Sequence, residues 1–72
     1  MQHEELLKLG KHIKELRLKR GLTISALCYR NALEPSTISR IEAGIVEAKY
    51  LTLLKIAKAF NMEIYELLNI KE

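Results

Sequence analysis

The sequence contains few of the residues that cross-link, kink or loosen a polypeptide chain. Its 72 residues include one cysteine, one proline, three glycines and no tryptophan. Because a single cysteine cannot form an internal disulfide, Cys28 excludes a disulfide-stabilised scaffold and favours a reducing compartment, the cytoplasm. No basic, apolar segment of the secretory type follows Met1. The fold must therefore depend on a hydrophobic core.

Long hydrophobic runs are also missing. Apolar stretches extend for only a few residues, far below the roughly 20 that span a bilayer, so we expect no membrane association. Apolar residues make up 49% of the chain and charged residues 29%, which favours one compact domain over residues 1–72. The net charge of +3 agrees with a polyanionic partner, but many proteins with this charge never bind nucleic acid.

A catalytic or metal-binding constellation is the third absence. His3 and His12 are too few, and too far from any cluster of carboxylates, to indicate a metal site. Cys28 is better explained as a small buried apolar group. We therefore expect no metal, no cofactor and no enzymatic activity.

What the sequence does contain is helical periodicity. Apolar residues spaced by three and four predict a first helix from about Glu4 to Arg20, with Gly21 as a left-handed C-cap. Its apolar stripe is formed by Leu6, Leu9, Ile13 and Leu16. Thr23 is the expected N-cap of a short second helix that ends near Asn31 or Ala32 and turns Leu27 and Cys28 inward.

Three more helices are expected, and no strand pattern competes with them. Pro35 suits the first turn of a third helix, which is closed by Gly44. Its inward residues are Ile38 and Ile41, and its outward residues are Ser36, Thr37, Ser39 and Arg40. A fourth helix turns Leu53, Leu54, Ala57 and Phe60 inward, and Asn61 suits the left-handed turn that follows it. A fifth, from Glu63 to Asn69, turns Ile64, Leu67 and Leu68 inward. The predicted fold class is all-α.

The segment LTISALCYRNALEPSTISRIEAG, from Leu22 to Gly44, resembles the helix-turn-helix of the lambda-repressor-like Cro/C1 (Xre) family. The resemblance continues through LTLLKIAKAF and IYELL, and YRNAL is also similar to the corresponding part of restriction-modification controller proteins. It implies a five-helix DNA-binding domain with the helix-turn-helix at about residues 23–43. It also implies a regulator of transcription that binds a specific site in double-stranded DNA.

Within that resemblance, the third helix enters the major groove and contacts base edges. The residues implied are Pro35, Ser36, Thr37, Ser39 and Arg40. Arg40 has the greatest power to discriminate, because arginine pairs bidentately with guanine. The alternative is that Ser36 and Thr37 only complete the helix N-terminus and that Arg40 meets a phosphate.

Phosphate contacts are expected at the N-terminal ends of the second and fourth helices, where free backbone amides favour an anion. Thr23 and Tyr50 mark those ends, and Lys49 lies just before the fourth helix. The resemblance further implies a structural ion pair between Arg17 and Glu42. The alternative for this pair is two independent surface charges.

Several residues depart from the family's pattern. Ile24 stands where a glutamine is frequent, and Ala32 replaces the usual turn glycine. Either Ala32 tolerates an unfavourable backbone angle or the turn has another shape. The loop Ile45–Glu47 lacks the basic residues that are common there, and Ala48 replaces a common proline.

One short recognition helix reads only a few base pairs, so we expect a two-fold homodimer. The candidate interface residues are Ile45, Val46, Tyr65 and Ile70, whose alternative interpretation is scattered surface hydrophobicity. The second function considered is a protein-interaction module, such as an antitoxin that masks a toxin and regulates its own transcription. A protein partner of this kind would bind at Ile45 and Val46 and at the short tail from Asn69 to Glu72.

Overall fold

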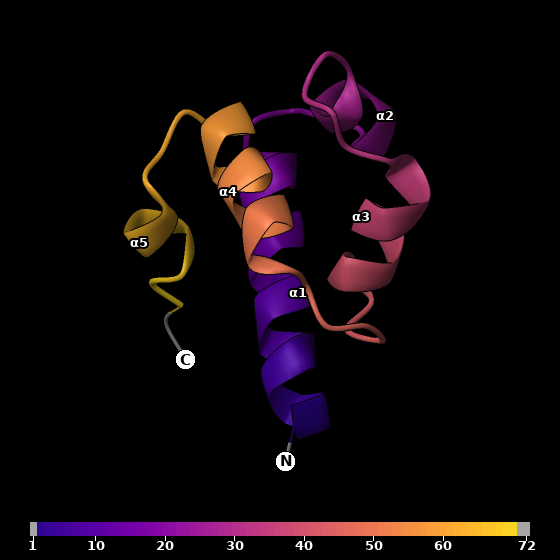
Figure 1. Ribbon diagram of the computed structural model, residues 1–72, viewed down its shortest axis with the longest axis vertical. Coiled ribbons are helices and arrows are strands. Elements are labelled where there is room, and N and C mark those ends of the chain that lie inside the picture. The colour runs from indigo at the N-terminus through magenta and orange to yellow at the C-terminus, as the bar shows by residue number, and fades with distance from the viewer. Residues whose placement is uncertain (1, 71–72) are drawn as a thin grey trace.

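The computed structural model describes the backbone of residues 2–70 and the side chains of residues 4–70. Within this range the chain forms five helices and no strand, as expected for the all-α class. The helices are α1 (Gln2–Lys19), α2 (Ile24–Cys28), α3 (Pro35–Glu42), α4 (Tyr50–Ala59) and α5 (Ile64–Leu67). In Figure 1 the long α1 runs through the middle of the molecule, with α2 and α3 on one side and α5 on the other. None of the described helices is long and apolar enough to cross a membrane.

The core draws one large side chain from each helix. The five largest fully buried side chains are Ile13, Leu27, Ile38, Ile56 and Leu67, and none is more than 1% exposed. Burying a side chain of this size stabilises a fold by roughly 1.5 to 3 kcal/mol. Because the five belong to five helices, the same core fixes all the helices relative to one another, including α3.

Two helix ends differ from the expected boundaries. α2 ends at Cys28, because Tyr29 is extended and Arg30 and Ala32 then take positive φ angles of 62° and 55°. α5 ends at Leu67, and Leu68 is 44% exposed, so the prediction that Leu68 points inward was wrong. A helix rotates by about 100° per residue, and the four residues of α5 therefore turn only one narrow face to the core.

α1 and α3 approach so closely that a glycine is required at the crossing. A Cβ atom on Gly10 would lie 2.6 Å from the carbonyl oxygen of Glu42 and 2.8 Å from its carbonyl carbon. Gly44, just beyond α3, has a φ of +74°, and a Cβ there would lie 2.7 Å from the Leu7 side chain. At Gly10 the atoms in contact are backbone on both helices, so the C-terminal end of α3 packs directly against α1.

Candidate nucleic-acid interface

α3 presents a polar face because its apolar side chains are fixed in the core. Ile38 and Ile41 are buried, and Pro35 stands in the first turn, where a missing N–H costs no hydrogen bond. The exposed residues are Pro35, Ser36, Ser39 and Arg40. Thr37 is only half-buried rather than fully outward, so part of its side chain remains accessible. This face is short and polar, with one cation near its end, and a helix of this kind fits the major groove of B-DNA.

The turn between α2 and α3 is made without the usual glycine. Ala32 takes the left-handed conformation itself, which costs an L-residue about 1 to 2 kcal/mol. Asn31 braces the turn, because its side-chain amide donates to the carbonyl oxygens of Leu27 (2.6 Å) and Tyr29 (3.1 Å). Lys55 Nζ on α4 donates to the Ala32 carbonyl oxygen at 3.4 Å. The backbone that leads into α3 is therefore braced mainly by Asn31, with one long contact from α4.

The expected phosphate-contacting residues lie at two helix N-termini. Thr23 is the N-cap of α2, and its Oγ1 accepts a hydrogen bond from the Ala26 amide at 3.0 Å, which still allows its O–H to donate to a phosphate. Lys49 is the N-cap of α4, where its side chain makes no capping hydrogen bond. Lys49 and the 60%-exposed Tyr50 are both accessible beside free backbone amides. α4 thus offers the more complete anion-binding end.

Arg17 and Glu42 form an ion pair that joins α1 to the end of α3. Arg17 Nε donates to Glu42 Oε2 at 2.8 Å, and Arg17 Nη2 donates to Oε1 at 3.0 Å. Arg17 Nη1 also donates to the Leu22 carbonyl oxygen at 2.7 Å. The Arg17 and Glu42 side chains are only 8% and 6% exposed. Hydrogen bonding to Glu42 raises the pKa of Arg17 and outweighs the opposing effect of burial.

Cys28 and the histidines form no reactive or metal-binding cluster in the described part of the chain. Cys28 is buried, and burial, with a smaller contribution from the Glu42 charge, raises the pKa of its thiol. His12 Nε2 is buried without a hydrogen-bond partner. Among residues 4–70 no group of three or more histidine, cysteine, aspartate or glutamate side chains could hold a metal ion. The side chain of His3 lies outside this range.

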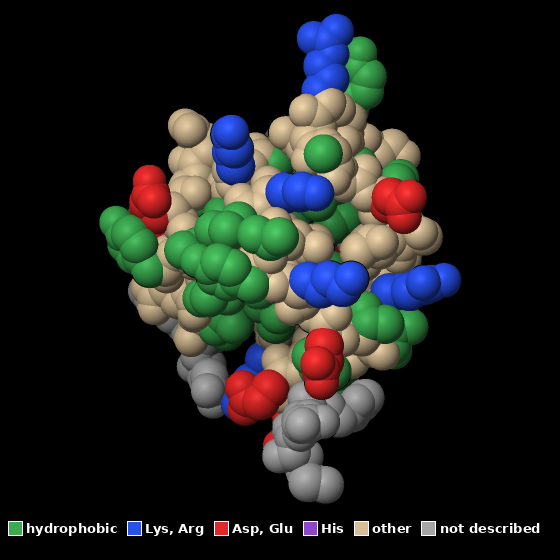
Figure 2. Space-filling model, in the orientation of Figure 1, with side chains coloured by type: hydrophobic (Ala, Val, Ile, Leu, Met, Phe, Trp, Pro, Cys, Tyr) green, Lys and Arg blue, Asp and Glu red, His purple; other side chains and the backbone are tan. Residues whose placement is uncertain are grey.

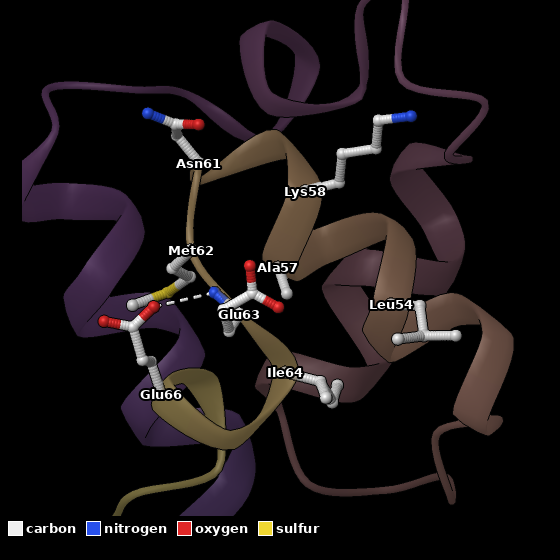
Figure 3. Close-up of a pocket in the computed structure, with 8 residues that line it drawn as sticks. All are labelled: Leu54, Ala57, Lys58, Asn61, Met62, Glu63, Ile64 and Glu66. Carbon is white, nitrogen blue, oxygen red and sulfur yellow. Dashed lines mark hydrogen bonds between the residues drawn. The ribbon is translucent and has the colours of Figure 1, made fainter.

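A hollow of about 430 Å³ lies between the C-terminal half of α4 and α5. Its lining residues include Leu54, Lys58 and Ile64 (Figure 3). The Glu63 backbone amide donates to Glu66 Oε1 at 2.8 Å beside it, so the Glu66 carboxylate caps α5. The hollow is open and has both apolar and charged walls.

The same side of the molecule carries an exposed apolar surface. Figure 2 shows hydrophobic side chains gathered over α4 and α5. Of the four residues expected at an interface, Ile45 and Tyr65 are 64% and 72% exposed, whereas Val46 and Ile70 are half-buried. Val46 packs against the core, so it is less available than the sequence suggested. Leu51 and Leu68, which are 69% and 44% exposed, were not among the residues predicted for an interface.

A comparison with models of protein families found a match that covers most of the chain. A model described as helix-turn-helix (HTH_3) matches residues 13–67, a span that begins within α1 and ends with α5. The chain belongs to this helix-turn-helix family. A search of curated protein sequences found no significant match.

Solved structures agree with this membership. The restriction-modification controller protein C.AhdI from Aeromonas hydrophila is similar with a TM-score of 0.85 and 31% sequence identity, over 90% of this chain and 98% of C.AhdI. An HTH_3 family transcriptional regulator from Vibrio cholerae has a TM-score of 0.84 and 22% identity, over 93% of this chain and 38% of that one. The clp gene regulator ClgR from Corynebacterium glutamicum has a TM-score of 0.79 and 22% identity, over 88% and 67%. At 22% identity these last two show only the fold.

Two departures of this helix-turn-helix domain have structural explanations. Ile24 packs partly against the core rather than offering a polar group to a phosphate. Ala32 keeps the turn by accepting a positive φ, which answers the question that the sequence left open. α3 is therefore placed by packing and by the braced turn, without the glutamine and the glycine.

Proposed function

We propose that this chain is a transcription regulator that recognises a specific site in double-stranded DNA through α3. The observation that carries the proposal is the polar face of α3, which is backed by two buried isoleucines and fixed at both ends. Membership of the helix-turn-helix family supports it. C.AhdI, which is covered almost completely, is a restriction-modification controller protein, so we propose the same controller type here.

In this proposal α3 reads base edges and the flanking helix ends hold phosphates. Arg40 pairs bidentately with a guanine, while the hydroxyls of Ser36 and Ser39 bond to neighbouring bases. Pro35 and the accessible part of Thr37 contribute apolar contacts, for which the thymine methyl is suited. The phosphate contacts come from the helix ends marked by Thr23, Lys49 and Tyr50. Lys49 is the only cation among these three, so it carries the largest share of the salt dependence.

The functional species in this proposal is a two-fold homodimer. The exposed leucines Leu51 and Leu68, with Tyr65, give α4 and α5 an apolar surface that a second copy would cover, and the proposed interface also includes Ile45 from the loop before α4. α5 lies on the opposite side of α1 from α3 (Figure 1), so a pair joined through α5 would carry both recognition helices at its outer ends. Such a pair suits helices separated by one DNA turn, about 34 Å. The operator would then be a near-palindrome with half-site centres about 10 base pairs apart.

Selection of bound duplexes from a random pool, at about physiological salt, tests the proposed function. The expected result is enrichment of a near-palindrome by the wild-type chain. A chain that binds without enriching any sequence would contradict the proposal and would favour the protein-interaction alternative instead.

Light scattering over a micromolar concentration range tests the dimer. Leu51→Glu combined with Leu68→Glu is expected to give a monomer with unchanged helical content and weaker operator binding, because charges would be forced into the apolar interface. The control is Lys14→Glu on the exposed face of α1. A wild-type monomer that binds an isolated half-site as well as the full palindrome would refute the dimer.

A further inference from the structure

A cationic hollow lies beside the turn of the helix-turn-helix. Its lining residues are Arg30, Asn31, Ala32, Lys55 and Lys58, and its volume is about 430 Å³. The first three come from the turn between α2 and α3, and the two lysines are three residues, or about one helical turn, apart on α4. Figure 2 shows Lys and Arg side chains over the upper half of α4 and beside this turn. No acidic residue lines the hollow.

Among residues 4–70, no acidic side chain forms an ion pair with Arg30, Lys55 or Lys58. Like charges gathered at one place repel, and an anion that binds between them removes that repulsion. The hollow is therefore suited to a group of negative charge.

The donors of this hollow remain available to such a group. Lys55 Nζ lies 3.4 Å from the Ala32 carbonyl oxygen, a long and weak hydrogen bond that leaves most of the ammonium's capacity free. The Arg30 guanidinium lies over the Tyr29 ring, 5.2 Å from the ring centroid. This stacking orients the guanidinium and leaves the N–H groups at its edges able to donate to a ligand. The side-chain amide of Asn31 already donates to the carbonyl oxygens of Leu27 and Tyr29, so Asn31 lines the hollow without offering its amide N–H groups to a ligand.

We propose that Arg30, Lys55 and Lys58 form a phosphate-binding site, in addition to the phosphate contacts at the N-termini of α2 and α4. Arginine and lysine together supply the fork and the point charge with which proteins bind phosphate oxygens. The phosphate belongs either to the DNA backbone or to a free phosphorylated compound. The turn leads directly into Pro35 at the start of α3, so the hollow adjoins the helix that the proposed function seats in the DNA groove. The DNA assignment rests on the proposed function.

Fluorescence anisotropy over 50 to 200 mM salt tests the DNA source. The probes are the duplex recovered by selection and a scrambled duplex of equal composition. Loss of one phosphate contact lowers the slope of log affinity against log salt by about 0.9, so Lys58→Gln is expected to lower it by that amount and Lys55→Gln with Lys58→Gln by about 1.8. Lys58→Arg retains the charge and is expected to keep the wild-type slope. The charge-matched control, Lys14→Gln on α1, is expected to leave the slope nearly unchanged.

Titration of the DNA-free chain with inorganic pyrophosphate tests the other source, and thermal melts verify that each variant folds. Pyrophosphate binding that is lost in Lys58→Gln, with an unchanged salt slope, would assign the site to a free phosphorylated compound. Equal slopes for Lys58→Gln and Lys14→Gln, with no pyrophosphate binding, would overturn the proposal. If the wild-type chain binds both duplexes equally, the proposed function fails, while a slope difference between these two variants still supports the phosphate site.

Discussion

Replacing Arg17 with alanine removes three hydrogen bonds that its guanidinium donates. Two of them go to the Glu42 carboxylate and one to the Leu22 carbonyl oxygen. Glu42 is then left as an unpaired charge whose side chain is only 6% exposed. Breaking a buried pair from one side costs about 3 to 5 kcal/mol, a large part of the stability of a small domain. We expect a loss of that size in the free energy of unfolding.

A double-mutant cycle with Glu42→Ala, followed by urea denaturation, separates the pair from its surroundings. Once Arg17 is absent, removal of Glu42 costs little or even stabilises the fold, so the coupling energy is expected to be about 2 kcal/mol or more. The exposed pair Glu5–Lys8 is the control, and Glu5→Ala is expected to cost less than about 1 kcal/mol. Effects of Arg17→Ala and Glu42→Ala that add within about 0.5 kcal/mol would refute the reasoning.

Three further predictions follow from buried positions. Gly10→Ala is expected to destabilise the fold by about 1 to 3 kcal/mol, although helix propensity alone favours alanine by about 1 kcal/mol, because the new methyl group meets the α3 backbone. Chemical denaturation decides the sign. Folding raises the pKa of the Cys28 thiol, so the stability linked to this pKa is complete below the unfolded pKa and is lost as pH rises through the folded value. Denaturation above about pH 9 should show this loss in the wild type and not in Cys28→Ala. Equal pH profiles for the two chains would contradict the prediction. His12→Leu is expected to leave the free energy of unfolding unchanged or raise it by about 1 kcal/mol, because Nε2 is buried without a hydrogen-bond partner. A large drop in melting temperature would show that the imidazole makes an essential contact.

Hydrophobic spacing predicted the long helices well, because α1, α3 and α4 each bury a regular stripe. It predicted the short helices poorly. The end of α2 depends on positive φ angles at Arg30 and Ala32, and neither residue type signals a left-handed turn as glycine or asparagine does. Leu68 has the same apolar character as Leu67, and only the end of α5 determines which of them is buried.

The candidate site divides in the same way. Periodicity could predict the outward face of α3, because Ile38 and Ile41 point into the core and the other side chains of the helix must therefore point outward. The ion pair came only from the family resemblance, because no local pattern connects two residues 25 positions apart. Gly10 gave no signal, since a glycine in a helix does not reveal a close backbone approach elsewhere. The cationic hollow at the turn depends on how α4 packs, which spacing alone cannot give.

Binding of Arg40→Ala to every single-base variant of the selected duplex tests most directly whether α3 reads sequence. The account predicts that base preference relaxes at one operator position, at a cost of about 1 to 3 kcal/mol for the preferred base, while preferences elsewhere persist. Lys49→Ala, at the phosphate-contacting end of α4, is expected to weaken all sequences alike and to lower the salt slope by about one. An Arg40→Ala variant that loses the same affinity for every sequence would contradict base reading by Arg40 and assign it to the DNA backbone.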